Sequence, residues 1–302
     1  MLIKSAGQIT LPKNIKMMIY GQAGTGKTSL ALSMPKPLLL DFDGGVSRVH
    51  FAHLDGVDIV QVGSWNEINE LFQLDLSAYE TIVIDTASKM MDFIIDYKVK
   101  GRQPRLQDWG AINQECVAFM RNLSMSGKNI VYIAHRDNYK DGDQTIYIPN
   151  MRAKNLGPII TELDLLGYLE IRGGQRTLTF NPTERSEGKN SCNMPAAMTI
   201  PTIIDANNNP TAPNNFLTEH VLKPFRESLE KKKATQMAYA SLVNEIKAEI
   251  SAIADAKGAN EFIAKIDEFD HVGNSKAIAA TMLRDKAAQL GLVFDKKSKL
   301  YA

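Results

Sequence analysis

The sequence contains few of the residues on which disulfide-rich, zinc-binding and membrane-spanning proteins depend. Its 302 residues include two cysteines, Cys116 and Cys192, which excludes a disulfide framework and a four-cysteine zinc site. Its five histidines form no H-x-x-x-H pattern, which argues against a histidine zinc site. No apolar run approaches the roughly 18–20 residues of a membrane helix, and no signal peptide is recognisable. We therefore expect a cytoplasmic protein with no membrane partner.

The sequence also lacks a charge excess of either sign. Thirty-five basic and 34 acidic residues give a net charge of +1. This balance disfavours a wholly basic nucleic-acid-binding surface, so any such site must be a local patch. The length predicts about two domains at roughly 150 residues each.

The first 150 residues alternate between strand and helix signals. Short apolar runs separated by helix-length segments predict a mostly parallel sheet with helices on both faces. Turn residues after position 135 predict two β-hairpins, and helical periodicity returns near the end of the chain. We thus expect an α/β core over residues 1–228 and a small helical domain over 229–302. The expected strands are 15–20, 37–43, 57–62, 81–85 and 129–134, the hairpins 139–148 and 165–180, and the late helices 237–253, 260–269 and 275–290.

One segment carries a specific motif. Residues 21–28 fit G-x-x-x-x-G-K-[ST], the P-loop or Walker A pattern, at every fixed position, with a strand expected before it and a helix after it. The glycines let successive backbone N–H groups point at an anion, and the lysine adds a charge at the β- and γ-phosphates. We expect the loop to bind ATP with Mg²⁺ through Gly21, Gln22, Ala23, Gly24, Thr25, Gly26, Lys27, Thr28 and Ser29.

Two further carboxylates belong with this loop. The apolar run 81–85 ends in Asp85, the Walker B position, and this carboxylate and the Thr28 hydroxyl are the expected magnesium ligands. Asp41 and Asp43 end another strand and share one face, because strand side chains alternate. Asp43 is the more C-terminal of the two, so we expect it to reach the phosphates and to orient or deprotonate the attacking water.

Together these features resemble the RecA-like division of the P-loop ATPases. More narrowly, the chain is similar to phage RecA-core ATPases associated with single-strand annealing, over about residues 10 to 228. In the RecA-like division the catalytic carboxylate ends the strand after the P-loop helix, as Asp43 does here, although RecA has Glu at this place. The matching segments are 20–28, 35–45, 82–88, 108–110, 129–135 and 180–201.

The resemblance implies roles for three more residues. His135 ends a strand and would sense the γ-phosphate. RecA-like enzymes act at subunit interfaces and use a cation from a neighbour, for which Lys189 is the first candidate and Arg185 the second. We expect both cations to lie on a flexible turn. A ring or filament of identical subunits follows from this arrangement.

Two basic segments are candidates for binding single-stranded DNA, which RecA-like proteins bind through loops in these positions. Cations neutralise phosphates, and tyrosines at 139 and 147 could stack on bases. The resemblance implies a DNA-stimulated ATPase in phage recombination or replication, in the host cytoplasm, with a single-strand-binding or annealing protein as a further candidate partner. The candidate cations are Lys98, Lys100, Arg102, Arg105, Arg136, Lys140, Arg152 and Lys154.

Two alternatives stay open from the sequence. The chain could be an ATP-gated loader or binding module with little or no catalysis, a hypothesis that gains if Asp43 lies far from the phosphates. It could also be a P-loop kinase for a small molecule. Such kinases usually place the magnesium aspartate on the strand adjacent to the loop strand, and they need an arginine-rich lid, which we do not see in the sequence.

Overall fold

The computed structural model describes residues 11–151 and 153–302. By its internal contacts the chain divides into two compact units, one made of residues 12–226 and the other containing residues 227–302. None of the helices in these described ranges combines the length and apolarity that a membrane crossing requires.

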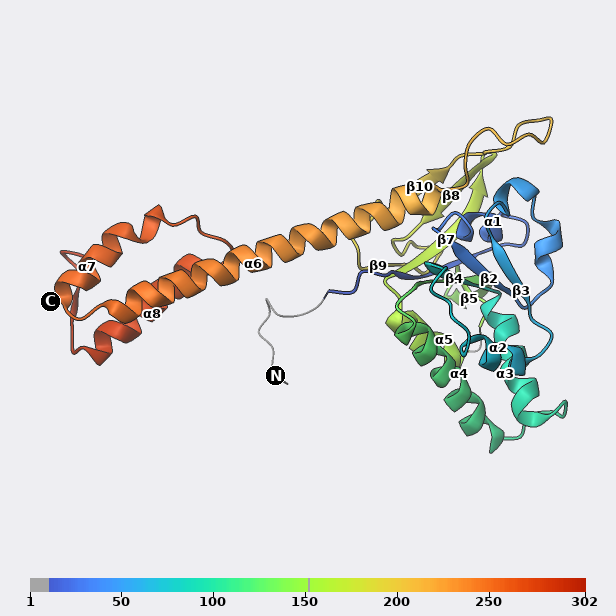
Figure 1. Ribbon diagram of the computed structural model, residues 1–302, viewed down its shortest axis with the longest axis horizontal. Helices are drawn as coiled ribbons and strands as arrows, with labels where there is room; N and C mark the ends of the chain where they lie inside the picture. The colour runs from blue at the N-terminus through green and yellow to red at the C-terminus, as the bar shows by residue number, and fades with distance from the viewer. Residues whose placement is uncertain (1–10, 152) are drawn as a thin grey trace. The chain divides into compact units, whose positions relative to one another are not determined.

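The first unit is an α/β domain built on one large, mostly parallel sheet (Figure 1). Its parallel strands follow the order β7-β1-β5-β4-β2-β3, so β5 lies between β1 and β4. The fold class expected from the sequence is thus confirmed. The strands are β1 (Lys16–Gly21), β2 (Pro37–Asp41), β3 (Asp58–Gln61), β4 (Thr81–Asp85), β5 (Asn129–Asp141) and β7 (Leu165–Arg172).

Antiparallel strands extend this sheet and produce the two predicted hairpins. The second half of β5 pairs with β6, and β7 pairs with β8, which in turn pairs with β10. The short strand β9 pairs with the start of β7. These strands are β6 (Gln144–Pro149), β8 (Gln175–Thr179), β9 (Lys189–Asn190) and β10 (Ala197–Ile200).

Both faces of the sheet are buried, which explains why its central strands are continuously apolar. Met18 and Tyr20 face a core formed with helices α2 to α5, whereas Met17 and Ile19 lie on the opposite face, where α1 packs. The helices of this unit are α1 (Lys27–Ala31), α2 (Trp65–Leu71), α3 (Ala87–Val99), α4 (Asp108–Met125) and α5 (Ala153–Glu162), with shorter turns η2 (Gly45–Arg48), η3 (Phe51–His53) and η4 (Thr218–Leu222).

The second unit is helical, as expected, and has its own apolar core. Ile246 and Ile250 pack with Phe262, Ala279 and Leu283 from the two following helices. The first helix begins at Lys223, 14 residues before the predicted start at 237. The elements are α6 (Lys223–Ala252), α7 (Ala256–Lys265), η5 (Ile266–Glu268), α8 (Ser275–Gln289) and a small hairpin of β11 (Phe294–Asp295) and β12 (Leu300–Tyr301).

Candidate active site

The glycines of the P-loop are each required by the local backbone. Gly24 and Gly26 have φ angles of 77° and 86°, in the left-handed region that favours glycine. A Cβ added to Gly21 would lie 2.2 Å from the Leu169 carbonyl oxygen on the neighbouring strand β7. Gly21 thus permits close packing of the end of β1 against β7, and Gly24 and Gly26 permit the tight turn from β1 into α1.

Lys27 is buried at the base of this loop, with 5% of its surface exposed. Its Nζ donates a hydrogen bond to the Gln22 carbonyl oxygen at 2.9 Å, across the loop. Burial lowers the pKa of Lys27, while the negative charges of Asp85 and Asp43 act in the opposite direction. No carboxylate lies within ion-pair distance of this ammonium in the described part of the chain. The loop therefore holds a desolvated cation that an anionic ligand would stabilise.

Thr28 and Asp85 meet beside Lys27, although they come from different elements. The Thr28 hydroxyl donates a hydrogen bond of 2.6 Å to Asp85 Oδ2. Burial raises the pKa of Asp85 to about 6, and Asp43 and Asp41 also raise it, whereas the Thr28 hydrogen bond and Lys27 oppose the shift. A hydroxyl and a carboxylate are hard oxygen donors of the kind that Mg²⁺ prefers. The pair fits a magnesium ion bound next to the phosphates.

The expectation that Asp41 and Asp43 end one strand and share a face was wrong, because β2 ends at Asp41. Asp41 is buried, and its carboxylate accepts hydrogen bonds from the backbone N–H groups of Gly45 (3.1 Å) and Val46 (3.3 Å). Asp43 lies two residues beyond the strand, is half-buried, and accepts one hydrogen bond of 2.8 Å from the Gly45 N–H. Asp41 therefore stabilises the turn at residues 42–46 that follows β2.

Asp43 faces the site. Its negative charge acts on Lys27, Asp85 and His135, which come from three different elements. That Asp43 reaches the phosphates stays a prediction.

His135 completes the cluster from strand β5. It lies opposite Gly21 in the parallel pairing of β1 and β5. Burial lowers the pKa of His135, the Lys27 charge lowers it further, and the Asp43 charge raises it. His135 therefore lies within electrostatic reach of both groups, at the point where β5 leaves the sheet to form the hairpin with β6.

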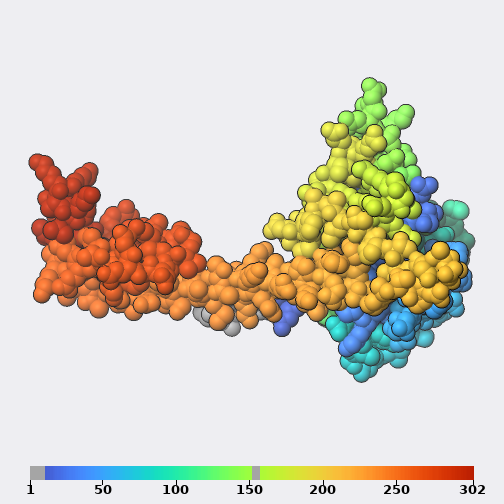
Figure 2. All heavy atoms as spheres, turned by 90° about the horizontal axis from the view of Figure 1, so that it is seen from above, coloured from blue at the N-terminus to red at the C-terminus, as the bar shows by residue number. Residues whose placement is uncertain are grey.

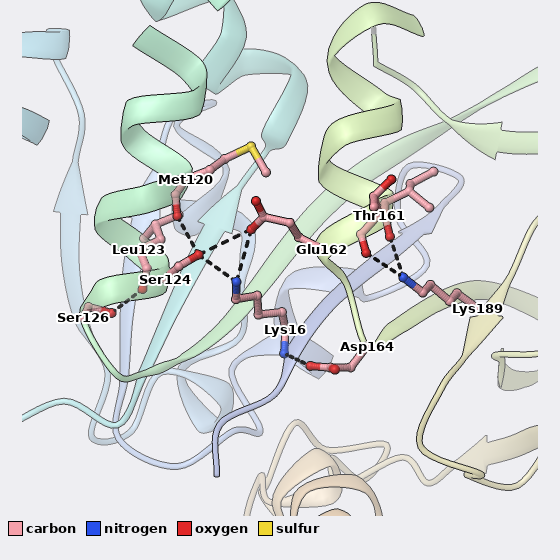
Figure 3. A network of polar contacts seen from close by, with 10 residues as sticks. Lys16, Met120, Leu123, Ser124, Ser126, Thr161, Glu162, Asp164 and Lys189 are labelled. Atoms are coloured by element: carbon pink, nitrogen blue, oxygen red, sulfur yellow. Dashed lines mark hydrogen bonds and ion pairs between the residues drawn. The ribbon is translucent and has the colours of Figure 1, made fainter. Parts of the chain in front are cut away.

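The two candidate cations for a subunit interface are not on a flexible turn. The Lys189 ammonium donates hydrogen bonds of 2.9 Å to the carbonyl oxygens of Ile160 and Thr161 at the end of α5 (Figure 3). Lys189 pairs with Leu166 at the start of β7, whereas Gly21 pairs with Leu169 toward the other end of that strand. Lys189 therefore lies at the amino edge of the sheet, away from the P-loop of its own chain.

Arg185 is exposed, but its backbone is fixed. Its carbonyl oxygen accepts a hydrogen bond of 2.7 Å from the Tyr147 N–H in β6. The Glu187 N–H donates to the Tyr147 carbonyl oxygen at 3.0 Å, and the Tyr20 hydroxyl donates to the Glu187 carbonyl oxygen at 2.6 Å. The expectation of a flexible turn was wrong, because these contacts tie the segment to the β5–β6 hairpin.

The first basic segment, between α3 and α4, is only partly available to a ligand. Lys98 forms an ion pair of 2.6 Å with Glu115, and Arg102 forms a bidentate pair with Asp108 at 2.6 and 2.7 Å. The Arg102 hydrogen bonds lower the pKa of Asp108 to about 2. The side chains of Lys100 and Arg105 are exposed.

The second basic segment is the β5–β6 hairpin, which continues β5 beyond His135 (Figure 2 shows its green tip projecting from the core). Arg136 stacks over the Tyr147 ring at 4.4 Å and donates to the Tyr168 hydroxyl at 3.0 Å. Lys140 and Tyr139 are exposed toward the tip. Of the remaining candidates, Arg152 and the side chain of Lys154 lie outside the described residues.

Arg176 is a site residue that sequence reasoning missed. It lies on β8, pairs with Ile171 of β7, and reaches the P-loop at Gly26, where an added Cβ would be 3.4 Å from its Nε. No motif marks this arginine, since only the order of strands in the sheet brings β8 near the loop.

The geometry defines the class of the protein. A glycine-rich loop after β1, a threonine bonded to the aspartate that ends β4, and an intervening strand β5 together make a P-loop NTPase domain. The chain belongs to an AAA domain family, whose model matches residues 13–192.

One curated protein and one solved structure show how far this similarity extends. The SPbeta prophage-derived uncharacterized protein YorG of Bacillus subtilis is 26% identical over 170 residues, which is 51% of this chain and 50% of that protein. The chain thus spans about half the length of the curated relative it matches. The KaiC-like protein PH0186 of Pyrococcus horikoshii is 12% identical, with a TM-score of 0.36 over 55% of this chain and 77% of that one.

Proposed function

We propose that this P-loop domain is a RecA-like ATPase that binds Mg²⁺·ATP and hydrolyses it. The observation that carries the proposal is the convergence of Lys27, the Thr28–Asp85 pair, Asp43 and His135 at one edge of the sheet. These groups come from four different strands or the loops that follow them. In an open α/β sheet this carboxyl edge is where ligands bind.

Each residue has a distinct role in the proposed reaction. The loop N–H groups and Lys27 hold the phosphates, and Thr28 with Asp85 would hold Mg²⁺, which neutralises charge on the phosphate oxygens when bound. Asp43 orients and deprotonates the attacking water, because it is the half-exposed carboxylate of the cluster. His135 detects the terminal phosphate from the adjacent strand.

The β5–β6 hairpin supports single-stranded DNA as the second ligand. It begins directly after His135, so the nucleotide site and the hairpin share one continuous strand. Lys140 and Tyr139 give it an exposed cation and an exposed ring, which are suited to phosphate neutralisation and base stacking. We propose that ATP binding favours DNA binding through this strand and that hydrolysis releases the DNA.

Assembly and biological context follow from the same proposal. Identical subunits would form a ring or filament on DNA, with the exposed Arg185 as the cation that completes a neighbour's site. The prophage origin of YorG supports a role in phage recombination or replication, with a single-strand-binding or annealing protein as partner.

The two alternatives fare differently. The position of β5 between β1 and β4 disfavours a small-molecule kinase, in which the magnesium aspartate usually ends the strand next to the loop strand. The hydrogen bond from the Gly45 N–H to Asp43 favours an ATP-gated loader, because it occupies one oxygen of the proposed base.

The test is an ATPase assay with and without single-stranded DNA, with particle size measured in the same samples. We expect slow hydrolysis by the protein alone, faster hydrolysis with DNA, and larger particles when ATP and DNA are both present. ATP binding without hydrolysis under any condition would support the loader instead. If no nucleic acid stimulates ATP hydrolysis at low or moderate salt, the proposal that single-stranded DNA is the second ligand is contradicted.

A further inference from the structure

Arg176 approaches the P-loop from the side opposite to the catalytic cluster. Strand β1 has two neighbours in the sheet, β5 on one side and β7 on the other. His135 and the Asp85 strand lie on the β5 side, whereas Arg176 is on β8, which pairs with β7. Gly26 therefore has Lys27 and its acidic neighbours on one side and the Arg176 guanidinium on the other.

A cavity of about 100 Å³ opens at this contact. Gly26 and Ser29 of the P-loop form one wall, and Arg176, Asn214 and Phe216 are among the residues that line the rest. Asn214 is fixed in place because its Nδ2 donates a hydrogen bond of 2.9 Å to the Ser29 carbonyl oxygen. The cavity is thus continuous with the loop that carries the phosphate-binding N–H groups.

The Arg176 side chain is half-buried, and in the described part of the chain it forms no hydrogen bond or ion pair. Two other arginines, on β7 and β5, are neutralised or satisfied by the chain itself. Arg172 forms an ion pair of 2.7 Å with Glu170, and Arg136 bonds the Tyr168 hydroxyl. A partly desolvated guanidinium without an anion is unfavourable unless a ligand supplies one.

The position indicates which part of a nucleotide would supply the anion. P-loop N–H groups surround the α- and β-phosphates, and the loop lysine reaches the β- and γ-phosphates. Arg176 contacts the loop at Gly26 and lines the cavity with Ser29, whereas Asp43 and His135 lie on or just after strands on the other side of β1, which favours the phosphates that are not transferred as its ligand.

We propose that Arg176 binds the non-transferred phosphates of the nucleotide, so that the P-loop grips the phosphate chain between Lys27 on one side and Arg176 on the other. The inference rests on the proposed function, because it requires a nucleotide in the loop. Arg176 is then a binding and positioning residue for both substrate and product. It contributes to affinity for ATP and ADP alike and not to the cleavage step.

The experiment compares Arg176→Ala and Arg176→Lys with the wild type and with Arg172→Ala, a control that removes an exposed arginine side chain from the same β7–β8 hairpin. Binding of Mg²⁺·ATP, Mg²⁺·ADP and inorganic tripolyphosphate is measured by calorimetry, and KM and kcat are measured separately. Hydrogen bonds to charged groups contribute about 1.5–3 kcal/mol, so we expect Arg176→Ala to weaken all three ligands by about 10–100-fold. KM should rise with kcat nearly unchanged, Arg176→Lys should recover part of the loss, and Arg172→Ala should match the wild type.

Three results would overturn the inference. If Arg176→Ala binds all three ligands as tightly as the wild type, Arg176 does not contact the phosphates. If Arg176→Ala binds ATP more weakly but binds tripolyphosphate with unchanged affinity, Arg176 contacts the base or the sugar and not the phosphates. A fall in kcat that leaves ADP binding intact assigns it to the transferred phosphate. If Arg176→Ala binds the ligands more weakly but also has an altered melting temperature, the comparison uses Arg176→Lys instead, because this variant keeps the aliphatic stem and the positive charge. If the wild type binds none of the ligands, the proposed function itself fails, which is a separate outcome.

Discussion

At the amino edge of the parallel sheet the charged side chains are paired within the chain, whereas at the carboxyl edge several are not. Lys16 at the start of β1 bonds Ser124 and Glu162, and Lys189 bonds two helix carbonyls (Figure 3). At the other edge Lys27 is buried without an ion-pair partner in the described residues, and the pKa of Asp85 is raised.

This difference separates residues that stabilise the fold from residues that await a ligand. Paired charges at the amino edge satisfy each other, so their removal costs stability. Unpaired, desolvated charges at the carboxyl edge are costly in the free protein, and a Mg²⁺-nucleotide would compensate for them. The contrast predicts opposite effects for mutations at the two edges.

The largest expected effect is that of Lys27→Ala. It removes the cation that would hold the β- and γ-phosphates, so ATP hydrolysis should fall to background. Melting temperature should stay near that of the wild type, because losing the hydrogen bond to the Gln22 carbonyl oxygen is offset by removing a buried cation that has no ion pair within the described chain. A phosphate-release assay and a thermal melt check both parts, and retained turnover would contradict the role of the loop.

Asp43→Asn should slow hydrolysis by about 10²–10⁴-fold, the usual contribution of a general base, while ATP still binds. Asp43→Glu, which has the longer side chain found in RecA, should keep much of the activity. Asp55→Asn, an exposed acid in the following loop, serves as the control. Equal turnover in Asp43→Asn and the wild type would exclude Asp43 as the base and favour the loader.

Asp85→Asn should stabilise the metal-free protein while it abolishes magnesium-dependent activity. Burial raises the pKa of Asp85 to about 6, so its ionised form is disfavoured in the folded state, and stability falls as pH rises from about 4 to 6. Removing the charge should therefore add about 3 kcal/mol at pH 8, about half as much at pH 5, and nothing below about pH 4.

Urea unfolding with EDTA, followed by fluorescence of Trp65 and Trp109 in the first unit, measures this effect. Asp137→Asn, at an exposed position, is the matched control. A variant that is less stable than the wild type at pH 8 would show that Asp85 is a structural residue of the same kind as those at the amino edge.

Lys189→Ala should destabilise the protein, in contrast to Asp85→Asn. It should lower the free energy of unfolding by about 1–2 kcal/mol, because two carbonyl oxygens lose a charged donor. Lys36→Ala, which breaks an exposed ion pair with Glu80, should change it by less than about 1 kcal/mol. The sequence-based role as a cation acting on a neighbour predicts instead an inactive variant that regains activity when mixed with Lys27→Ala. If ATPase activity returns in that mixture, Lys189 acts on the site of a neighbouring subunit and is not only a structural residue.

The smallest expected effect is at the hairpin. Lys140→Ala should weaken single-stranded DNA binding several-fold and reduce the salt dependence by about one phosphate contact. Lys257→Ala in the second unit is the control, since it removes one exposed charge elsewhere. An unchanged salt dependence would exclude the Lys140 contact.

Local patterns were sufficient to predict the strands and the P-loop. Apolar runs marked β1 and β4, and the motif spacing identified Lys27 and Thr28 because their chemistry is local. The early part of α6 was missed because residues 226–236 contain one large apolar side chain, Leu229, and so have too few apolar positions to reveal the helical period.

Long-range register limited the rest. Lys189 looked like a loop cation until the pairing of β9 with β7 placed it beside the end of α5. Arg176 gave no signal, since its approach to Gly26 depends on the pairing of β8 with β7 and of β7 with β1. Neither contact can be deduced from spacing along the chain.

The most direct test of the account is calorimetric titration of the wild type and Lys27→Ala with Mg²⁺·ATP at pH 8. We predict one saturable site per chain in the wild type, lost when EDTA removes the metal and absent in Lys27→Ala. A wild type that binds no nucleotide, or a Lys27→Ala variant that binds as tightly as the wild type, would contradict the claim that the carboxyl edge is built for a nucleotide.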